Sequence, residues 1–163
     1  MKLAFNSFEK FVKDCTRWMS YIAYIALSLM VLFVVADIIG NKLFKTPVPG
    51  GIEFVSLLSV IAISFAIAQT QIEHGHIEVE MLVRSLPRKA QKIIAVCVHL
   101  CSIALFIVLS VMSFKYGASL QAGGEVSMTL GLPFYPFIWG IGVSSIFVIL
   151  VLIMQLWSVL RKN

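Results

Sequence analysis

Residues 134–157 read FYPFIWGIGVSSIFVILVLIMQLW, and this stretch contains no charged side chain. A helix rises about 1.5 Å per residue, so about 20 consecutive apolar residues cross the hydrocarbon core of a bilayer, which is about 30 Å thick. Backbone N–H and C=O groups find no water in lipid, and a helix satisfies them internally. The stretch therefore predicts a membrane-spanning helix.

Three further apolar blocks reach a similar length, at residues 18–39, 52–72 and 93–116. The chain is 60% hydrophobic and 13% charged, whereas soluble domains carry about 45–50% apolar and about 25% charged residues. Its 163 residues fit one domain. The sequence thus predicts an all-α integral membrane protein, in which residues 1–163 form a single domain with four transmembrane helices.

Residues 1–17 separate apolar from polar side chains at helical spacing. The apolar face holds Ala4, Phe5, Phe8, Phe11, Val12 and Cys15. The polar face holds Lys2, Asn6, Glu9, Lys10, Lys13, Asp14 and Arg17. Because helices of this kind lie in the plane of the membrane surface, we expect an interfacial amphipathic helix over residues 1–17, rather than a disordered tail.

Lys and Arg are distributed unevenly among the segments outside the predicted spans. Ten of the thirteen lie in the amino-terminal segment, the second loop and the tail: Lys2, Lys10, Lys13, Arg17, Arg84, Arg88, Lys89, Lys92, Arg161 and Lys162. Cytoplasmic segments carry such an excess, so we expect both termini and the second loop in the cytoplasm. The net charge of +5 sits at helix ends and forms no basic face with interleaved aromatics, which argues against nucleic-acid binding.

The centres of the four predicted spans are almost free of ionisable residues. Asp37, Glu53 and Lys115 lie near the outer ends, where they could pair to fix helix order or dock a neighbouring subunit, or could instead extend to lipid headgroups. An ion carrier would place a carboxylate near the membrane midplane, where ionisable residues are functional candidates. The sequence therefore predicts that this chain builds no transport pathway alone.

Two clusters have the composition of metal sites but not the geometry. One follows the second span and comprises Glu73, His74, His76, Glu78 and Glu80, and we interpret it as a solvated helix cap. In the other, Cys97 and Cys101 share a helix face from which His99 points away. Without a nucleophile elbow or a phosphate-binding glycine loop, we expect no metal, no cofactor and no enzymatic activity.

Four short motifs give the chain a resemblance to a known family. They are PGGIE at 49–53, HGHIEV at 74–79, LP at 86–87 and SMTLGLP at 127–133. With the four-span layout, their order and spacing resemble the small membrane subunit, of the DctQ type, of tripartite ATP-independent periplasmic (TRAP) transporters. The motif positions carried over are Gly51, Glu53, His76, Ser127 and Pro133.

The resemblance implies a scaffold subunit of the bacterial inner membrane that pairs with a large many-span permease subunit. In this family a periplasmic binding protein delivers an organic acid, of the C4-dicarboxylate or sialic acid type, and a sodium gradient drives import. Lys42 and Lys45, the cations of the first loop, are then candidates for docking the binding protein, or else contact lipid phosphates.

Two other functions remain open from the sequence. One is a haem-bearing electron-transfer subunit, in which His74 or His76 pairs with His99 as axial ligands. The other is an autonomous small exporter, against which the missing midplane carboxylate argues.

Overall fold

The computed structural model describes residues 2–45, 49–73 and 87–161, and most of these residues lie in four long helices. The helices are α1 (Lys2–Phe44), α2 (Gly51–Ile72), α4 (Arg88–Gly123) and α5 (Tyr135–Arg161). Each is long and apolar enough to cross a membrane. The predicted all-α class is confirmed, and each predicted span falls on one of these helices.

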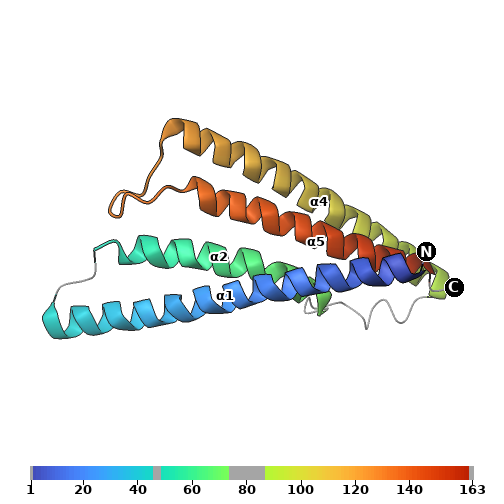
Figure 1. Ribbon diagram of the computed structural model, residues 1–163, viewed down its shortest axis with the longest axis horizontal. Coiled ribbons are helices and arrows are strands. Elements are labelled where there is room, and N and C mark those ends of the chain that lie inside the picture. Colours follow the sequence, from blue (N-terminus) through green and yellow to red (C-terminus); the bar gives the residue numbers. More distant parts are fainter. Residues whose placement is uncertain (1, 46–48, 74–86, 162–163) are drawn as a thin grey trace.

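The helices form two antiparallel hairpins that lie side by side in one layer (Figure 1). α1 packs along α2, α4 packs along α5, and α2 and α5 join the two hairpins. α1 and α4 therefore lie at opposite edges of the layer. Both termini lie at one end, here called the terminal end; the opposite, loop end carries the start of α2 and the segment 124–134. The shared end of the termini agrees with the predicted topology, whereas the side of the membrane that it faces remains a prediction.

α1 is one unbroken helix of 43 residues, and this differs from the separate interfacial helix expected over 1–17. At about 1.5 Å per residue it is about 64 Å long, about twice the hydrocarbon thickness. Val12 and Thr16 are fully buried, while Phe11 is 61% exposed. The buried stripe of the span thus continues into the amino-terminal segment, because those residues pack against protein. Placement of 1–17 in the membrane surface stays a prediction.

Two helices also extend beyond their predicted ends at the loop end. α1 continues to Phe44, so Lys42 lies in its last turn and not in a loop. Lys45 ends the helix with a left-handed φ of +55°, and its N–H donates to the Asn41 carbonyl at 3.0 Å. α4 continues through Gly117 to Gly123, beyond the predicted end of the span at 116. The Trp139 ring of α5 fills the space that a side chain at 117 would need, which favours glycine there.

The contacts between helices are made largely by small and branched apolar residues. Ala26 of α1 packs with Leu58 and Ala62 of α2, and Ala68 of α2 packs with Val148 and Leu152 of α5. Small side chains let helix backbones approach closely, which is the usual basis of helix association in lipid.

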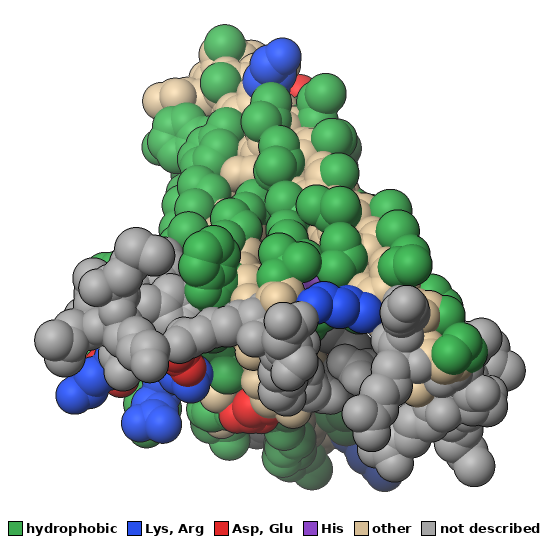
Figure 2. All heavy atoms as spheres, turned by 90° about the vertical axis from the view of Figure 1, so that its right-hand side faces the viewer, with side chains coloured by type: hydrophobic (Ala, Val, Ile, Leu, Met, Phe, Trp, Pro, Cys, Tyr) green, Lys and Arg blue, Asp and Glu red, His purple; other side chains and the backbone are tan. Residues whose placement is uncertain are grey.

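Large apolar side chains cover the outside of the layer (Figure 2). In the most apolar stretch of α4 only 6% of the residues are buried, against 39% in α5, as expected for an edge helix and an inner helix of the layer. Figure 2 looks onto the terminal end, where Lys and Arg side chains gather, and hydrophobic side chains line the helices that recede from it. This distribution fits a protein whose solvent is lipid.

Candidate functional site at the loop end

The Glu53 carboxylate, in the first turn of α2, binds the loop that precedes α5. Its Oε1 accepts hydrogen bonds from the Thr129 N–H at 3.1 Å and the Thr129 hydroxyl at 3.0 Å. Its Oε2 accepts from the N–H groups of Thr129 and Leu130, each at 3.2 Å. Thr129 is 76 residues further along the chain. We call Glu53, Thr129 and Leu130 the Glu53 clamp; its bonds to an ionised acceptor are about twice as strong as neutral ones.

The clamped loop also closes on itself around Ser127, which is only 3% exposed. The Ser127 N–H donates to the Leu132 carbonyl at 2.9 Å, and the Gly131 N–H donates to the Ser127 carbonyl at 3.1 Å. Val126 and Pro133 form an antiparallel bridge at the base of the loop. Gly131 has a φ of +63°, a conformation that glycine adopts without strain. The motif SMTLGLP is therefore a compact turn with its own hydrogen bonds.

The Leu130 side chain lies over Gly50, the residue before α2. Gly50 has a φ of +76°, and a Cβ placed there would lie 2.5 Å from Leu130 Cγ. Both the left-handed backbone and the close side chain favour glycine at this position. The start of α2 thus holds the loop in two ways, by the Glu53 carboxylate and by this close packing.

Gly51, the first residue of α2, is buried against α1. A Cβ at this position would lie 3.5 Å from the Phe33 ring and 3.6 Å from Oδ1 of Asp37. The Phe33 and Phe54 rings pack with centroids 4.8 Å apart. A carboxylate beside a helix N-terminus is favoured by the partial positive charge there. Asp37 and Glu53 therefore link α1, α2 and the loop before α5 in one chain of contacts.

Of the three charged residues expected near the outer ends, Glu53 has hydrogen-bond donors other than Lys115. Glu53 binds the loop, Asp37 lies at the start of α2, and Lys115 is exposed on α4. Among the described residues Glu53 and Lys115 form no ion pair with each other, and an ion pair far from them joins Lys13 to Glu9 at 2.6 Å. Backbone N–H groups of the loop, rather than a cation, satisfy Glu53.

At the terminal end, two side-chain amides join α2 to α5. Gln71 Nε2 donates to Gln155 Oε1 at 2.8 Å, and Gln155 Nε2 donates to the Gln71 carbonyl at 2.8 Å. Lys92 of α4 donates to the Leu160 carbonyl of α5 at 3.4 Å. The two glutamine bonds join one hairpin to the other, whereas the Lys92 bond lies within the hairpin of α4 and α5. We call Gln71 and Gln155 the glutamine pair.

The histidine and cysteine candidates form no cluster in the part of the chain that the structure covers. His99 Nδ1 lies 2.7 Å from the Ala95 carbonyl, one turn away on the same helix. Cys97 and Cys101 are exposed on another face, and among the described residues no three His, Cys, Asp or Glu side chains converge as metal ligands. His74 and His76 lie outside the described residues, so their pairing with His99 is not tested.

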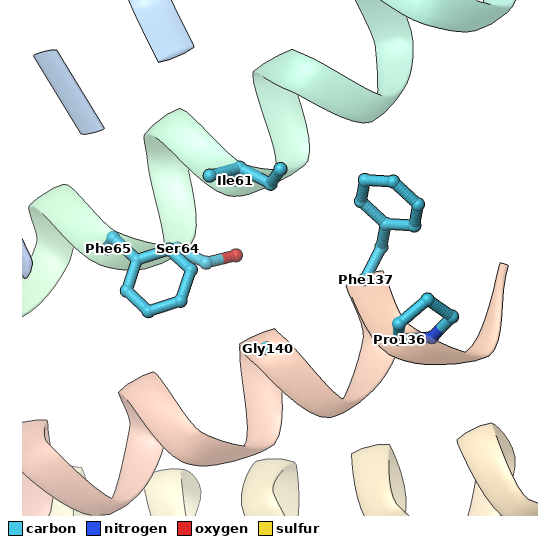
Figure 3. A pocket seen from close by; sticks show the side chains of 6 residues that line it. All are labelled: Ile61, Ser64, Phe65, Pro136, Phe137 and Gly140. Atoms are coloured by element: carbon cyan, nitrogen blue, oxygen red, sulfur yellow. The ribbon is translucent and has the colours of Figure 1, made fainter. Parts of the chain in front are cut away.

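A pocket of about 210 Å³ lies between α2 and α5 in the loop-end half of the layer (Figure 3). Its walls are Ile61, Ser64, Phe65, Pro136, Phe137 and Gly140. The Ser64 hydroxyl is the polar side-chain group among them, so the pocket offers no charge to an ion. It suits an apolar group and not a transported cation or acid.

Three kinds of site residue were not identified from the sequence. Leu130 donates through its backbone N–H, Thr129 through its backbone N–H and its hydroxyl, and Gly50 matters because it lacks a side chain. Residue type therefore gave little signal for these positions. The glutamine pair had a usable signal, since amides inside apolar spans often hydrogen-bond to a neighbouring helix.

The comparison with known proteins agrees with the family that the sequence motifs resemble. The sequence profile of the family described as tripartite ATP-independent periplasmic transporters, DctQ component, matches residues 30–162. A Haemophilus influenzae protein named as a candidate TRAP transporter small permease is 25% identical over 130 residues, covering 77% of this chain and 79% of that protein. Components of this family are transporter subunits and not enzymes. This multi-pass protein of the bacterial inner membrane therefore belongs to the DctQ component family of TRAP transporters.

Proposed function

We propose that this chain is the scaffold subunit of a three-part importer for an organic acid of the C4-dicarboxylate or sialic acid type. In this role it braces the large permease subunit in the membrane and helps the periplasmic binding protein to dock. The large subunit holds the substrate and couples its import to a sodium gradient. Family membership supports the assembly of this chain with a large permease subunit and a binding protein. The placement of charge in this chain supports the assignment of the substrate and ion sites to the large subunit.

The observation that carries this proposal is the position of the carboxylates along the helices. α4 and α5 contain no Asp or Glu. Asp37 and Glu53 lie at the loop end of α1 and α2, and Glu53 is engaged by backbone N–H groups. A sodium or proton pathway requires ionisable or oxygen-rich sites near the membrane midplane, so the ion and substrate sites belong to a partner.

Reconstitution tests this division of labour. Liposomes holding this chain alone, the chain with the large permease, or both with the binding protein are loaded to impose a sodium gradient. Uptake of radiolabelled succinate or sialic acid is expected only in the complete system, and it should stop when potassium replaces sodium. Sodium-driven uptake by the chain alone would contradict the scaffold role.

Two exposed lysines support the docking part of the proposal. Lys42 lies in the last turn of α1, and Lys45 is the first residue after that helix. Charge complementarity mainly raises the rate of encounter and fixes its register. Paired with an acidic patch on the binding protein, these lysines would guide docking, whereas contact with lipid phosphates would leave docking unaffected.

The double reversal Lys42→Glu with Lys45→Glu is expected to raise the binding-protein concentration for half-maximal uptake by about tenfold at low salt. The shift should shrink as salt rises, because ions screen exposed charges. Lys115→Glu makes on α4 the charge change of either single reversal, so it serves as the matched control for Lys42→Glu and for Lys45→Glu. Normal uptake by the double variant at every concentration would mean that the lysines do not dock the partner.

A further inference from the structure

Met128 lies at the tip of the clamped loop with its side chain 100% exposed. Val126 and Leu130 flank it and are 51% and 39% exposed. No charged residue occurs between Val126 and Pro133. We call Val126, Met128 and Leu130 the apolar tip. Exposed apolar side chains grouped on one element commonly mark a contact with another protein or with a membrane.

The loop cannot bury this tip by refolding onto the helices without losing its own bonds. Its inward N–H groups are bound by Glu53 at Thr129 and Leu130, and by the turn around Ser127. The Leu130 side chain is additionally seated against Gly50. Met128 therefore stays exposed in this conformation, and a partner would meet a preformed surface.

We propose that the apolar tip is a contact surface for the large permease subunit. This inference rests on the proposed function, and it assigns the two partners to different parts of the loop end. Permanent interfaces are more apolar than transient ones, and the tip carries no charge with which to steer a soluble partner. Lys42 and Lys45, at the end of α1, offer such charge instead.

The state of the loop before binding also favours a permanent and specific contact. A surface already fixed in its bound conformation loses little conformational entropy on association. Met is unbranched and polarisable, so it fits an irregular apolar hollow on a partner. Burial of Met128 in the assembled complex would give its fully exposed side chain van der Waals contacts that it lacks in this chain.

Site-specific photocrosslinking in the assembled transporter tests the contact directly. A benzophenone amino acid at Met128 is expected to give an adduct with the large permease subunit, both with and without the binding protein. The same probe at Gln121, exposed near the end of α4, is the matched control and should give little of this adduct. An adduct only with the binding protein, only with lipid, or none at all would overturn the inference.

A charge placed at the tip tests its contribution to assembly. Met128→Asp is expected to lower the amount of large subunit that co-purifies with this chain by about tenfold, because burying an unpaired carboxylate opposes the contact. Gln121→Asp introduces the same charge away from the tip and should leave recovery unchanged. Thermal unfolding of the isolated Met128→Asp chain should match wild type, since the side chain contacts nothing that supports the fold.

The outcomes separate this inference from the proposed function on which it rests. If the wild-type chain does not co-purify with the large subunit, the scaffold role and the apolar tip both fail. If the wild-type chain co-purifies and Met128→Asp does so equally well, the scaffold role stands and only the apolar tip is refuted.

Discussion

At the loop end a carboxylate joins α2 to the segment before α5, whereas at the terminal end two neutral amides join α2 to α5 itself. Glu53 receives four hydrogen bonds, from two backbone N–H groups and one hydroxyl, and each of its oxygens is used. Gln71 and Gln155 exchange two bonds, one of them to a backbone carbonyl. Both devices join the same two hairpins, but they differ in charge and in the structure that each holds.

The difference follows from where each device lies along the helices. A charge is costly to bury unless donors surround it, and at the end of a helix a loop can supply several backbone donors at once. Between two helices few backbone donors are free, so a neutral side chain that both donates and accepts is the better link. The loop end thus has a fixed, irregular surface, and the terminal end a simple helix–helix contact.

The largest expected effect concerns the orientation of the chain in the membrane, because the comparison assumes that the loop end faces the periplasm. In a variant without Cys15, Cys97 and Cys101, Lys45→Cys is expected to react with an impermeant thiol reagent applied from the periplasm, and Arg17→Cys is expected not to react until the membrane is opened. Both positions are exposed, so the contrast should be all-or-none.

Each variant labelled after detergent treatment provides the control for thiol accessibility. If Arg17→Cys were labelled from the periplasm and Lys45→Cys were not, the Glu53 clamp would face the cytoplasm. It could then not lie beside a periplasmic partner.

The next effect concerns the clamp itself. Glu53→Leu removes the acceptor of three donors and should release the loop, so that the amides of Thr129 and Leu130 exchange with deuterium about tenfold faster. Glu53→Gln keeps one side-chain oxygen and should give a smaller increase. Hydrogen exchange read by mass spectrometry on peptides covering 124–134 measures both variants.

The matched control is Gln69→Leu, which removes a side-chain bond at the far end of α2, from Gln69 Nε2 to Glu73 Oε1 at 2.6 Å. It should leave exchange in the loop unchanged. Unaltered exchange in Glu53→Leu would show that the turn around Ser127 is stable without the clamp.

Most of the fold could be predicted from the sequence, because lipid imposes helices and helices need a minimum apolar length. The ends of α1 and α4 could not. Apolar blocks mark where lipid lies, but a helix continues wherever its backbone hydrogen bonds can form, as α4 does through Gly117 to Gly123. The stripe through Val12 and Thr16 shows likewise that amphipathic character does not distinguish a membrane surface from a protein surface.

The site could be predicted only as separate motifs. Glu53 and Ser127 were identified as motif positions, but nothing in the local sequence shows that residues so far apart touch. Thr129 and Leu130 contribute backbone N–H groups, which every residue except proline carries, and their use depends on the turn that Gly131 permits. From the sequence, a cation was the expected partner of the Glu53 carboxylate, and Lys115 was the cation predicted to lie at a similar depth.

The smallest expected effect lies at the terminal end, where the glutamine pair can be compared with the clamp. Gln71→Leu and Gln155→Leu each leave polar atoms of the partner without a bond, and each is expected to lower the free energy of unfolding by about 1 kcal/mol, near the range measured for side-chain hydrogen bonds in membranes. Unfolding in detergent by added denaturing surfactant, followed by circular dichroism, measures the change.

The double variant Gln71→Leu with Gln155→Leu should be nearly as stable as wild type, because replacing both partners with apolar side chains leaves no side-chain amide unpaired. The cycle would then show a coupling energy of about 1–2 kcal/mol. Single effects that simply add in the double variant would mean that the amides act independently, and that packing of residues such as Ala68 against Val148 holds the terminal end. If the coupling is confirmed, apolar packing can replace the hydrogen bonds of the neutral glutamine pair. Glu53 differs, because its loss leaves backbone N–H groups that no apolar side chain can satisfy.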